Sequence, residues 1–171
     1  FSDCAHFVNS CERCGSLRTQ AFPQMPVQPR PTPPLPWHTI HIDIKGPLTR
    51  SGEYTNILVV VDALTRYCVY IPLSATDGSS IVNALITHVF SVFGYPAVIV
   101  SDNASNFKFG AMKEFTNLYG IRKLEVLTYS AASNGAAEAA VKRISNLLQR
   151  HTDSYKDWHL SLPQLQFALN T

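Results

Sequence analysis

No apolar run in the sequence approaches the roughly 20 residues that a membrane-spanning helix requires. Charge is also scarce: 15% of the 171 residues are charged and the formal net charge is +2, so no strong basic character indicates a nucleic-acid partner. Four cysteines are too few for a disulfide framework in a chain of this length. We therefore expect no membrane contact and no disulfide-stapled scaffold. The 46% hydrophobic content fits a globular domain with one sizeable core.

Composition divides the chain into three parts. Residues 1–20 carry Cys11-Glu-Arg-Cys14, a spacing typical of metal-binding or redox pairs. Residues 21–36 hold seven of the eleven prolines, which predicts a semi-rigid extended linker; a ligand for an SH3-type groove is the alternative. We expect the main domain over residues 37–171. There is no secretory signal, and we expect the sequence to be a fragment of a longer polypeptide.

The main domain alternates between strand and helix patterns. Three strands are expected first, as an antiparallel meander, followed by a helix capped by Ser79 or Ser80 and then by alternating strands and helices. The expected strands are 38–45, 56–62, 67–72, 97–101 and one within 121–128. The expected helices run from 79 or 80 to 93, then over 108–119, 135–154 and 157–170. This order predicts a mixed α/β sheet.

Three acids lie at the ends of these elements. Asp43 closes the first strand, Asp102 follows the fourth, and Glu138 lies in the first turns of the long helix. If the two strands are parallel neighbours, their carboxyl ends meet at one edge, where carboxylates suit a pair of hard divalent cations. Taken singly, each acid is more often a turn cap or a partner of the helix dipole. Asp62 also ends a strand, and there we expect a hairpin cap.

The residues around these acids carry a resemblance. The segments are Asp43-Ile-Lys-Gly-Pro47, Val100-Ser-Asp-Asn-Ala-Ser-Asn-Phe107 and Tyr129-Ser-Ala-Ala-Ser-Asn-Gly-Ala-Ala-Glu138, with the Cys11/Cys14 pair upstream. Together they resemble the integrase of retroviruses and LTR retrotransposons, closest to the Ty3/gypsy-like or Pao-like type. The resemblance covers essentially the whole chain.

The resemblance implies a fold and an activity. The fold is RNase H-like, a five-stranded mixed sheet with helices on both faces. The activity is metal-dependent 3′-end processing and strand transfer, with Asp43, Asp102 and Glu138 as catalytic residues that hold two Mg²⁺ or Mn²⁺ ions. The implied partners are retroelement DNA ends, target DNA and further copies of the chain. The protein would be made in the cytoplasm within a Pol polyprotein and would act in the nucleus.

The resemblance also suggests roles outside the three acids. Cys11 and Cys14 would be the last two ligands of a His-His-Cys-Cys zinc finger, with Zn²⁺ bound in the full-length parent. The positions proposed to contact DNA are Lys142, Arg143, Arg150, Tyr129 and Asn134. A solvated helix face explains the three basic residues equally well, and Tyr129 suits packing. Asn134 or Ser133 can cap the long helix, and Cys68 is expected to be a buried apolar filler.

Several positions depart from the family pattern. Alanine replaces glycine in the Ser-Asp-Asn-Gly-Ser element, and small residues replace His, Pro, Gln, Gln and Arg around the last acid; these are Ala104, Ser130, Ala131, Ala132, Ala136 and Ala139. Every metal ligand is retained while hydrogen-bonding contacts are lost. Two alternatives therefore stay open: a catalytically decayed or domesticated integrase-like domain that binds DNA or a partner, and a generic RNase H-like nuclease that cleaves RNA in a hybrid.

Overall fold

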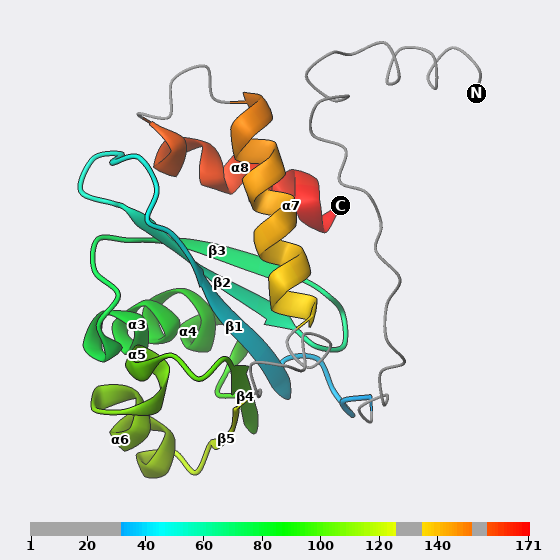
Figure 1. Ribbon diagram of the computed structural model, residues 1–171. Helices are drawn as coiled ribbons and strands as arrows, with labels where there is room; N and C mark the ends of the chain where they lie inside the picture. Colours follow the sequence, from blue (N-terminus) through cyan, green and yellow to red (C-terminus); the bar gives the residue numbers. More distant parts are fainter. Residues whose placement is uncertain (1–31, 126–134, 152–156) are drawn as a thin grey trace, which may run out of the picture.

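The computed structural model describes residues 32–125, 135–151 and 157–171 (Figure 1). Nine positions singled out from the sequence lie, or have their side chains, outside this part: Cys11, Cys14, Tyr129, Ser130, Ala131, Ala132, Ser133, Asn134 and Arg150. The same holds for residues 1–20 and for most of the proline-rich stretch. Their roles stay predictions.

One five-stranded sheet forms the centre of the molecule. Its strands are β1 (Thr39–Lys45), β2 (Asn56–Asp62), β3 (Cys68–Leu73), β4 (Val98–Ser101) and β5 (Arg122–Glu125), in the order β3-β2-β1-β4-β5. The β1–β2 and β2–β3 pairs are antiparallel, as the predicted meander requires. The β1–β4 and β4–β5 pairs are parallel. The sheet is therefore mixed, and β1 and β4 are the parallel neighbours on which the predicted acid cluster depends.

The first face of the sheet is covered by helices from the middle of the chain (Figure 1). These are α3 (Gly78–Leu85), the π-helical turn η1 (Ile86–Phe90), α4 (Ser91–Phe93), α5 (Ser105–Lys108) and α6 (Ala111–Leu118). Alternate residues of the strands point into this layer, including Ile40 and Ile42 of β1 and Leu58 and Val60 of β2. Period-two alternation thus assigns the intervening residues, among them His41 and Asp43, to the second face.

The second face is covered by the two C-terminal helices, but only in part (Figure 1). Helix α7 (Gly135–His151) lies against β1 and β2, and α8 (Trp158–Asn170) lies against β3. Their buried side chains pack on Val59 and Val61 of β2. Over β4 and β5, Val98, Val100 and Leu124 form a separate small cluster. Helices on both faces are confirmed, and the second face is left less covered beside β1.

Helix α8 also completes the edge of the sheet at β3. The Asn170 side chain accepts a hydrogen bond from Cys68 N–H (2.8 Å) and donates one to the Cys68 carbonyl (2.8 Å). Gln166 Oε1 accepts from Tyr70 N–H at 2.9 Å. At the other end of α8, Trp158 is fully buried and donates from Nε1 to the Thr49 carbonyl at 2.7 Å. Side-chain amides here take the place of a neighbouring strand.

Some expected boundaries are wrong. Helix α3 is capped by Asp77, whose carboxylate accepts from Ser79 and Ser80 N–H, and not by either serine. Asp77, two residues before Ser79, offers its carboxylate to both amides at once. The helix expected over 108–119 is α6, which begins only at Ala111, because the chain turns at Gly110 with φ +62°, a conformation that favours glycine; the short helix α5 before it was not expected. Within the described residues, no helix is long and apolar enough to cross a membrane.

Candidate functional site

Asp43 lies on the central strand, on the face that α7 partly covers. Its side chain is half-buried, and Oδ1 accepts a hydrogen bond from Ile44 N–H at 2.8 Å. In the β1–β2 register Asp43 is opposite Val59, which packs in the core beneath α7. A rigid, central backbone therefore fixes this carboxylate, as a metal ligand or an acid–base group requires.

Asp102 follows the last residue of β4, at the same edge of the sheet. It is exposed, and its Oδ1 accepts from Ala104 N–H at 3.1 Å, which holds the turn that leads into α5. Ala104 has φ −62° and packs against the first core layer. That backbone conformation is open to any residue, so the alanine at a position where the family carries glycine introduces no strain there.

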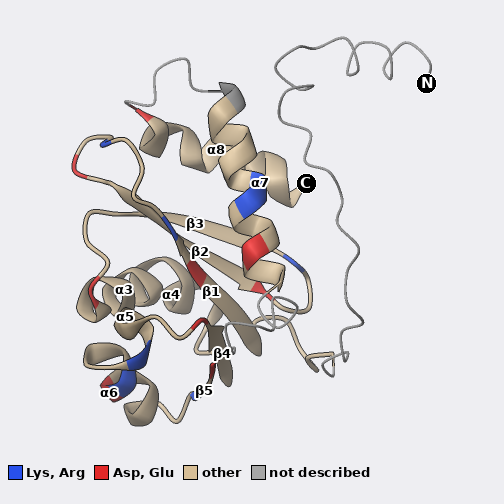
Figure 2. Ribbon diagram, viewed as in Figure 1, with Lys and Arg blue, Asp and Glu red and all other residues tan. Residues whose placement is uncertain are grey.

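Glu138 lies in the first turn of α7 and is exposed. The helix is oriented by apolar residues on one stripe: Ala140, Ile144 and Leu148 are buried against the sheet, as the sequence predicts for the last two. Figure 2 shows an acidic position near the start of α7 and another on β1, on the side of the sheet that the helix crosses. The helix N-terminus also favours an ionised carboxylate.

The three acids affect one another electrostatically. Burial raises the pKa of the Asp43 carboxyl above its ordinary value, the hydrogen bond from Ile44 N–H opposes this, and the negative charges of Asp102 and Glu138 raise the pKa further. The three carboxylates, from β1, the turn after β4 and the start of α7, therefore lie within electrostatic reach of one another. Such a cluster of like charges is a donor set that a divalent cation would stabilise.

The carboxylates are not yet gathered at ligand distance. Across residues 32–125, 135–151 and 157–171, no group of three His, Cys, Asp or Glu side chains is close enough to hold a metal ion as it stands. Repulsion among the acids works against closer approach in the absence of a cation. The residues present fit a hard divalent cation by the chemistry of their carboxylates, and holding one would require the exposed Asp102 and Glu138 side chains to approach Asp43.

Lys123 is a neighbour of this site that sequence reasoning missed. The Lys123 side chain on β5 is only 13% exposed, and its ammonium group donates to the Phe107 carbonyl in α5 and lies 3.8 Å from Glu125. Burial lowers the pKa of the Lys123 ammonium; Glu125 raises it, Lys108 lowers it and Asp102 raises it. Lys123 thus ties β5 to the segment that follows Asp102. The position of Lys123 beside this segment becomes evident only from the pairing of β5 with β4.

Asp62 has the structural role expected from the sequence. It is fully buried, and its carboxylate accepts from Trp37 N–H (2.8 Å), Thr65 N–H (2.8 Å) and the Thr65 hydroxyl (2.6 Å). The two bonds from Thr65 close the β2–β3 turn, and the bond from Trp37 anchors the chain just before β1. It takes no part in the acid cluster.

The basic residues of α7 have different surroundings. Lys142 is exposed. Arg143 is also exposed, and its guanidinium lies 3.6 Å from the sulfur of Cys68, beside Tyr70. Cys68 is buried, as expected, and also donates from Sγ to the Arg66 carbonyl at 3.3 Å. Arg143 therefore already packs against the sheet, whereas Lys142 points into solvent.

Comparison with known families and proteins shows which family this chain belongs to. The family model described as the integrase core domain matches residues 33–124. An uncharacterised protein of Caenorhabditis elegans is 36% identical over 141 residues, which cover 82% of this chain and 11% of that protein. The gypsy retrotransposon integrase-like protein 1 of Bos taurus is 26% identical over 171 residues, covering 99% of this chain and 34% of that protein.

Further relatives include a transposon and a virus. The transposon Tf2-3 polyprotein of Schizosaccharomyces pombe is 25% identical over 167 residues, which cover 94% of this chain and 12% of the polyprotein. A chain in the cryo-EM structure of the simian T-cell lymphotropic virus intasome, in complex with the PP2A regulatory subunit B56 gamma, superposes with a TM-score of 0.66 at 19% identity. It covers 99% of this chain and 59% of that chain. The expected RNase H-like fold is confirmed. The chain spans a third or less of the curated relatives described here.

Proposed function

Because this chain belongs to the integrase core domain family and is related to LTR-retrotransposon integrases, we propose that it catalyses metal-dependent 3′-end processing and strand transfer of retroelement DNA into target DNA. The observation that carries the proposal is the electrostatic coupling of Asp43 to both Asp102 and Glu138. Asp43 lies on β1 and Asp102 follows β4 at the carboxyl edge of this parallel strand pair, and Glu138 lies in the first turn of the helix that packs on β1. This carboxyl edge is where ligands of open α/β sheets bind.

In the proposed mechanism the protein contributes position and charge. Asp43, Asp102 and Glu138 would hold two Mg²⁺ or Mn²⁺ ions, which when bound neutralise charge on the attacking and leaving oxygens of a phosphodiester. Asp43 is held by Ile44 N–H and sets the centre of the site. Asp102 is oriented by Ala104 N–H. Water or a 3′-hydroxyl then attacks phosphorus in line, and the 3′-oxygen of the broken bond leaves.

The remaining roles belong to the same proposal. Retroelement DNA ends and target DNA are the proposed partners, bound by a homo-oligomer in the nucleus. Lys142, Arg143, Arg150, Tyr129 and Asn134 are proposed DNA contacts. Cys11 and Cys14 are proposed ligands of Zn²⁺ in the full-length parent.

A nicking assay tests the proposed reaction without knowledge of the terminal DNA sequence. Supercoiled plasmid is incubated with the full chain and Mn²⁺, and conversion to the open circle is followed. Asp102→Asn should slow nicking by about 100-fold or more, because loss of one ligand removes several kcal/mol of transition-state stabilisation. Asp157→Asn, an exposed acid at the start of α8, should leave the rate unchanged. Equal nicking by wild type and Asp102→Asn contradicts the assignment.

A second candidate function is an integrase-like DNA-binding domain without catalysis. The observation that favours it is that, among the described residues, no three acids are close enough to hold a metal ion. Alanine also stands at Ala136 and Ala139, where the family carries Gln and Arg. Binding of Mn²⁺ and DNA with no nicking supports this candidate. Cleavage of RNA in an RNA–DNA hybrid, with no action on DNA, supports a generic RNase H-like nuclease instead.

A further inference from the structure

We propose that the part of the second sheet face beside Asp43 that no described helix covers is a groove that binds one strand of DNA through its phosphates, with Arg66 and Arg122 on opposite walls. The groove encloses about 440 Å³. The proposal rests on the proposed function and adds to it a path by which a strand approaches the acids.

The sheet register builds the floor of the groove. His41 pairs with Val100, and Val100 with Leu124, so these three residues form one row across β1, β4 and β5. A second row, of Thr39, Val98 and Arg122, lies beneath it. Rows on one face are two residues apart, or about 6.6 Å along the strands. Asp43 belongs to the next row above His41, so the floor leads directly to the acids.

The walls are held by the same contacts that fix the chain before β1. Pro33 and Pro34 line one side, and the turn of Ala63 to Arg66 lines another. Asp62 joins these parts, because its side chain accepts from Trp37 N–H (2.8 Å) and its carbonyl accepts from Arg66 N–H (3.0 Å). Arg66 itself has φ +67°. The tight turn thus directs an arginine toward the groove.

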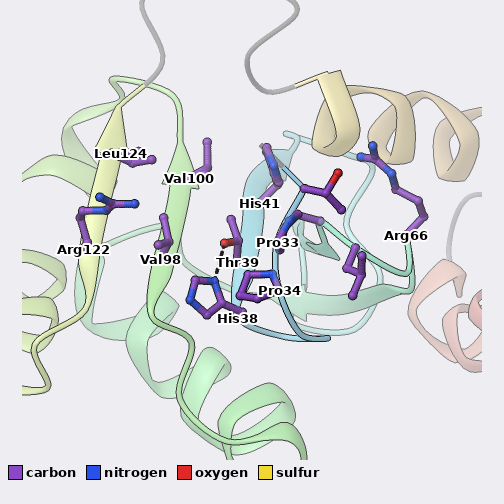
Figure 3. A pocket seen from close by; sticks show the side chains of 13 residues that line it. Pro33, Pro34, His38, Thr39, His41, Arg66, Val98, Val100, Arg122 and Leu124 are labelled. Carbon is purple, nitrogen blue, oxygen red and sulfur yellow. Dashed lines mark hydrogen bonds between the residues drawn. The ribbon is translucent and has the colours of Figure 1, made fainter. Parts of the chain in front are cut away.

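The charge of the lining favours an anion. Figure 3 shows Arg122 on the β5 side and Arg66 on the far side, with His38 and His41 between them. The lining contains these four basic side chains and no aspartate or glutamate. Both arginines are exposed, and among the described residues neither guanidinium pairs with a carboxylate. Guanidinium groups suit phosphate because they donate in a planar fork.

The dimensions favour one strand over a duplex. Arg66 follows β2 and Arg122 begins β5, three strand spacings away, or about 14 Å. A cavity of about 440 Å³ admits the sugar and base of a nucleotide but no double helix. The apolar floor of Val98, Val100 and Leu124 can pack against sugars, and imidazole rings can stack on bases.

Fluorescence anisotropy of a labelled oligothymidylate tests the groove. The full chain is titrated in EDTA, so that cations at the acids contribute nothing, over a series of KCl concentrations. The double variant Arg66→Gln/Arg122→Gln should bind at least about tenfold more weakly, and its salt slope should fall by about 1.4, or about 0.7 per lost phosphate contact. The matched control, Arg50→Gln/Lys113→Gln, removes two exposed cations outside the groove and should match the wild type.

Two results would overturn the groove. One is equal loss of affinity in both double variants, which indicates diffuse surface attraction. The other is an equal loss of affinity, in Arg66→Gln/Arg122→Gln, for the single strand and for a blunt duplex of the same length, because a duplex should not enter the groove. Circular dichroism verifies that each variant is folded. If the groove does not bind the oligonucleotide, Asp102→Asn can still abolish nicking. If Asp102→Asn does not affect nicking, the oligonucleotide can still bind the groove in EDTA. The two proposals can therefore be contradicted separately.

Discussion

Two aspartates at strand ends show how surroundings separate structure from chemistry. Asp62 is fully buried and accepts three hydrogen bonds from its own turn and from Trp37. Asp43 is half-buried, accepts one from the next residue and faces two further carboxylates. The first has its charge satisfied by the protein, and the second does not. An acid with unsatisfied charge in a folded protein indicates a ligand.

Removal of the Asp62 carboxylate should destabilise the fold. Asp62→Ala leaves two backbone amides and a hydroxyl without their acceptor, so we expect a loss of about 3 kcal/mol in the free energy of unfolding. Thr65→Ala removes one of the three bonds and should cost about 1 kcal/mol. Urea unfolding monitored by tryptophan fluorescence measures both. A smaller effect for Asp62→Ala than for Thr65→Ala contradicts the account of the turn.

The Asp43 carboxyl should give a stability difference that depends on pH. Its pKa is raised in the folded state, so between the ordinary value of 3.8 and the folded value the folded protein binds more protons than the unfolded chain. Stability contributed by the protonated form is therefore lost as pH rises through this window. Without divalent cations, Asp43→Asn should be more stable than the wild type at about pH 7, and the advantage should disappear near pH 3.

Urea unfolding in EDTA across this pH range measures the effect. Asp157→Asn serves as the control, because Asp157 is exposed at the start of α8 and its side chain makes no capping hydrogen bond. An advantage of Asp43→Asn that grows as the pH falls would show that the sign is wrong.

At the scale of elements, strands were easier to predict than helix boundaries. The apolar run Asn56–Asp62 predicts β2 to the residue, because a strand buried on both faces needs continuous apolar side chains. The π-turn at Ile86–Phe90 has no comparable signal. Asp77 was missed as a cap because two serines follow it. Asp43 and Asp102 were predicted to lie at one edge only if β1 and β4 are parallel neighbours, a condition that the strand pairing fulfils. The groove needs the pairing of three strands, which no local pattern specifies.

Docking of α8 depends on Trp158. The ring is fully buried, and Nε1 donates to the Thr49 carbonyl, which joins the helix to the β1–β2 connection. Trp158→Phe retains most of the buried apolar surface but leaves that carbonyl without its donor, so we expect a cost of about 2 kcal/mol. Trp158→Ala should cost about 4 kcal/mol through the added cavity. Thermal unfolding of both variants separates the two contributions, and equal costs would assign everything to the hydrogen bond.

At the scale of the whole molecule, the acids should couple folding to divalent cations. A cation that binds only the folded protein at 100 times its Kd adds about 2.7 kcal/mol, or about 5–10 °C in Tm for a chain of this size. Mn²⁺ should therefore raise the Tm of the wild type but not that of Glu138→Gln. Asp157→Asn should behave as the wild type. A similar rise in all three proteins would place the cation elsewhere.

The amides of Gln166 and Asn170 have a consequence for self-association. An uncapped outer strand offers free backbone donors and acceptors on which another chain can template cross-β growth. Here those groups are already occupied at Cys68 and Tyr70, so the sheet terminates at β3. Replacing these two side chains should expose the backbone groups of β3 to pairing with another chain. A protein in which α8 has detached from the sheet would therefore be prone to form fibrils.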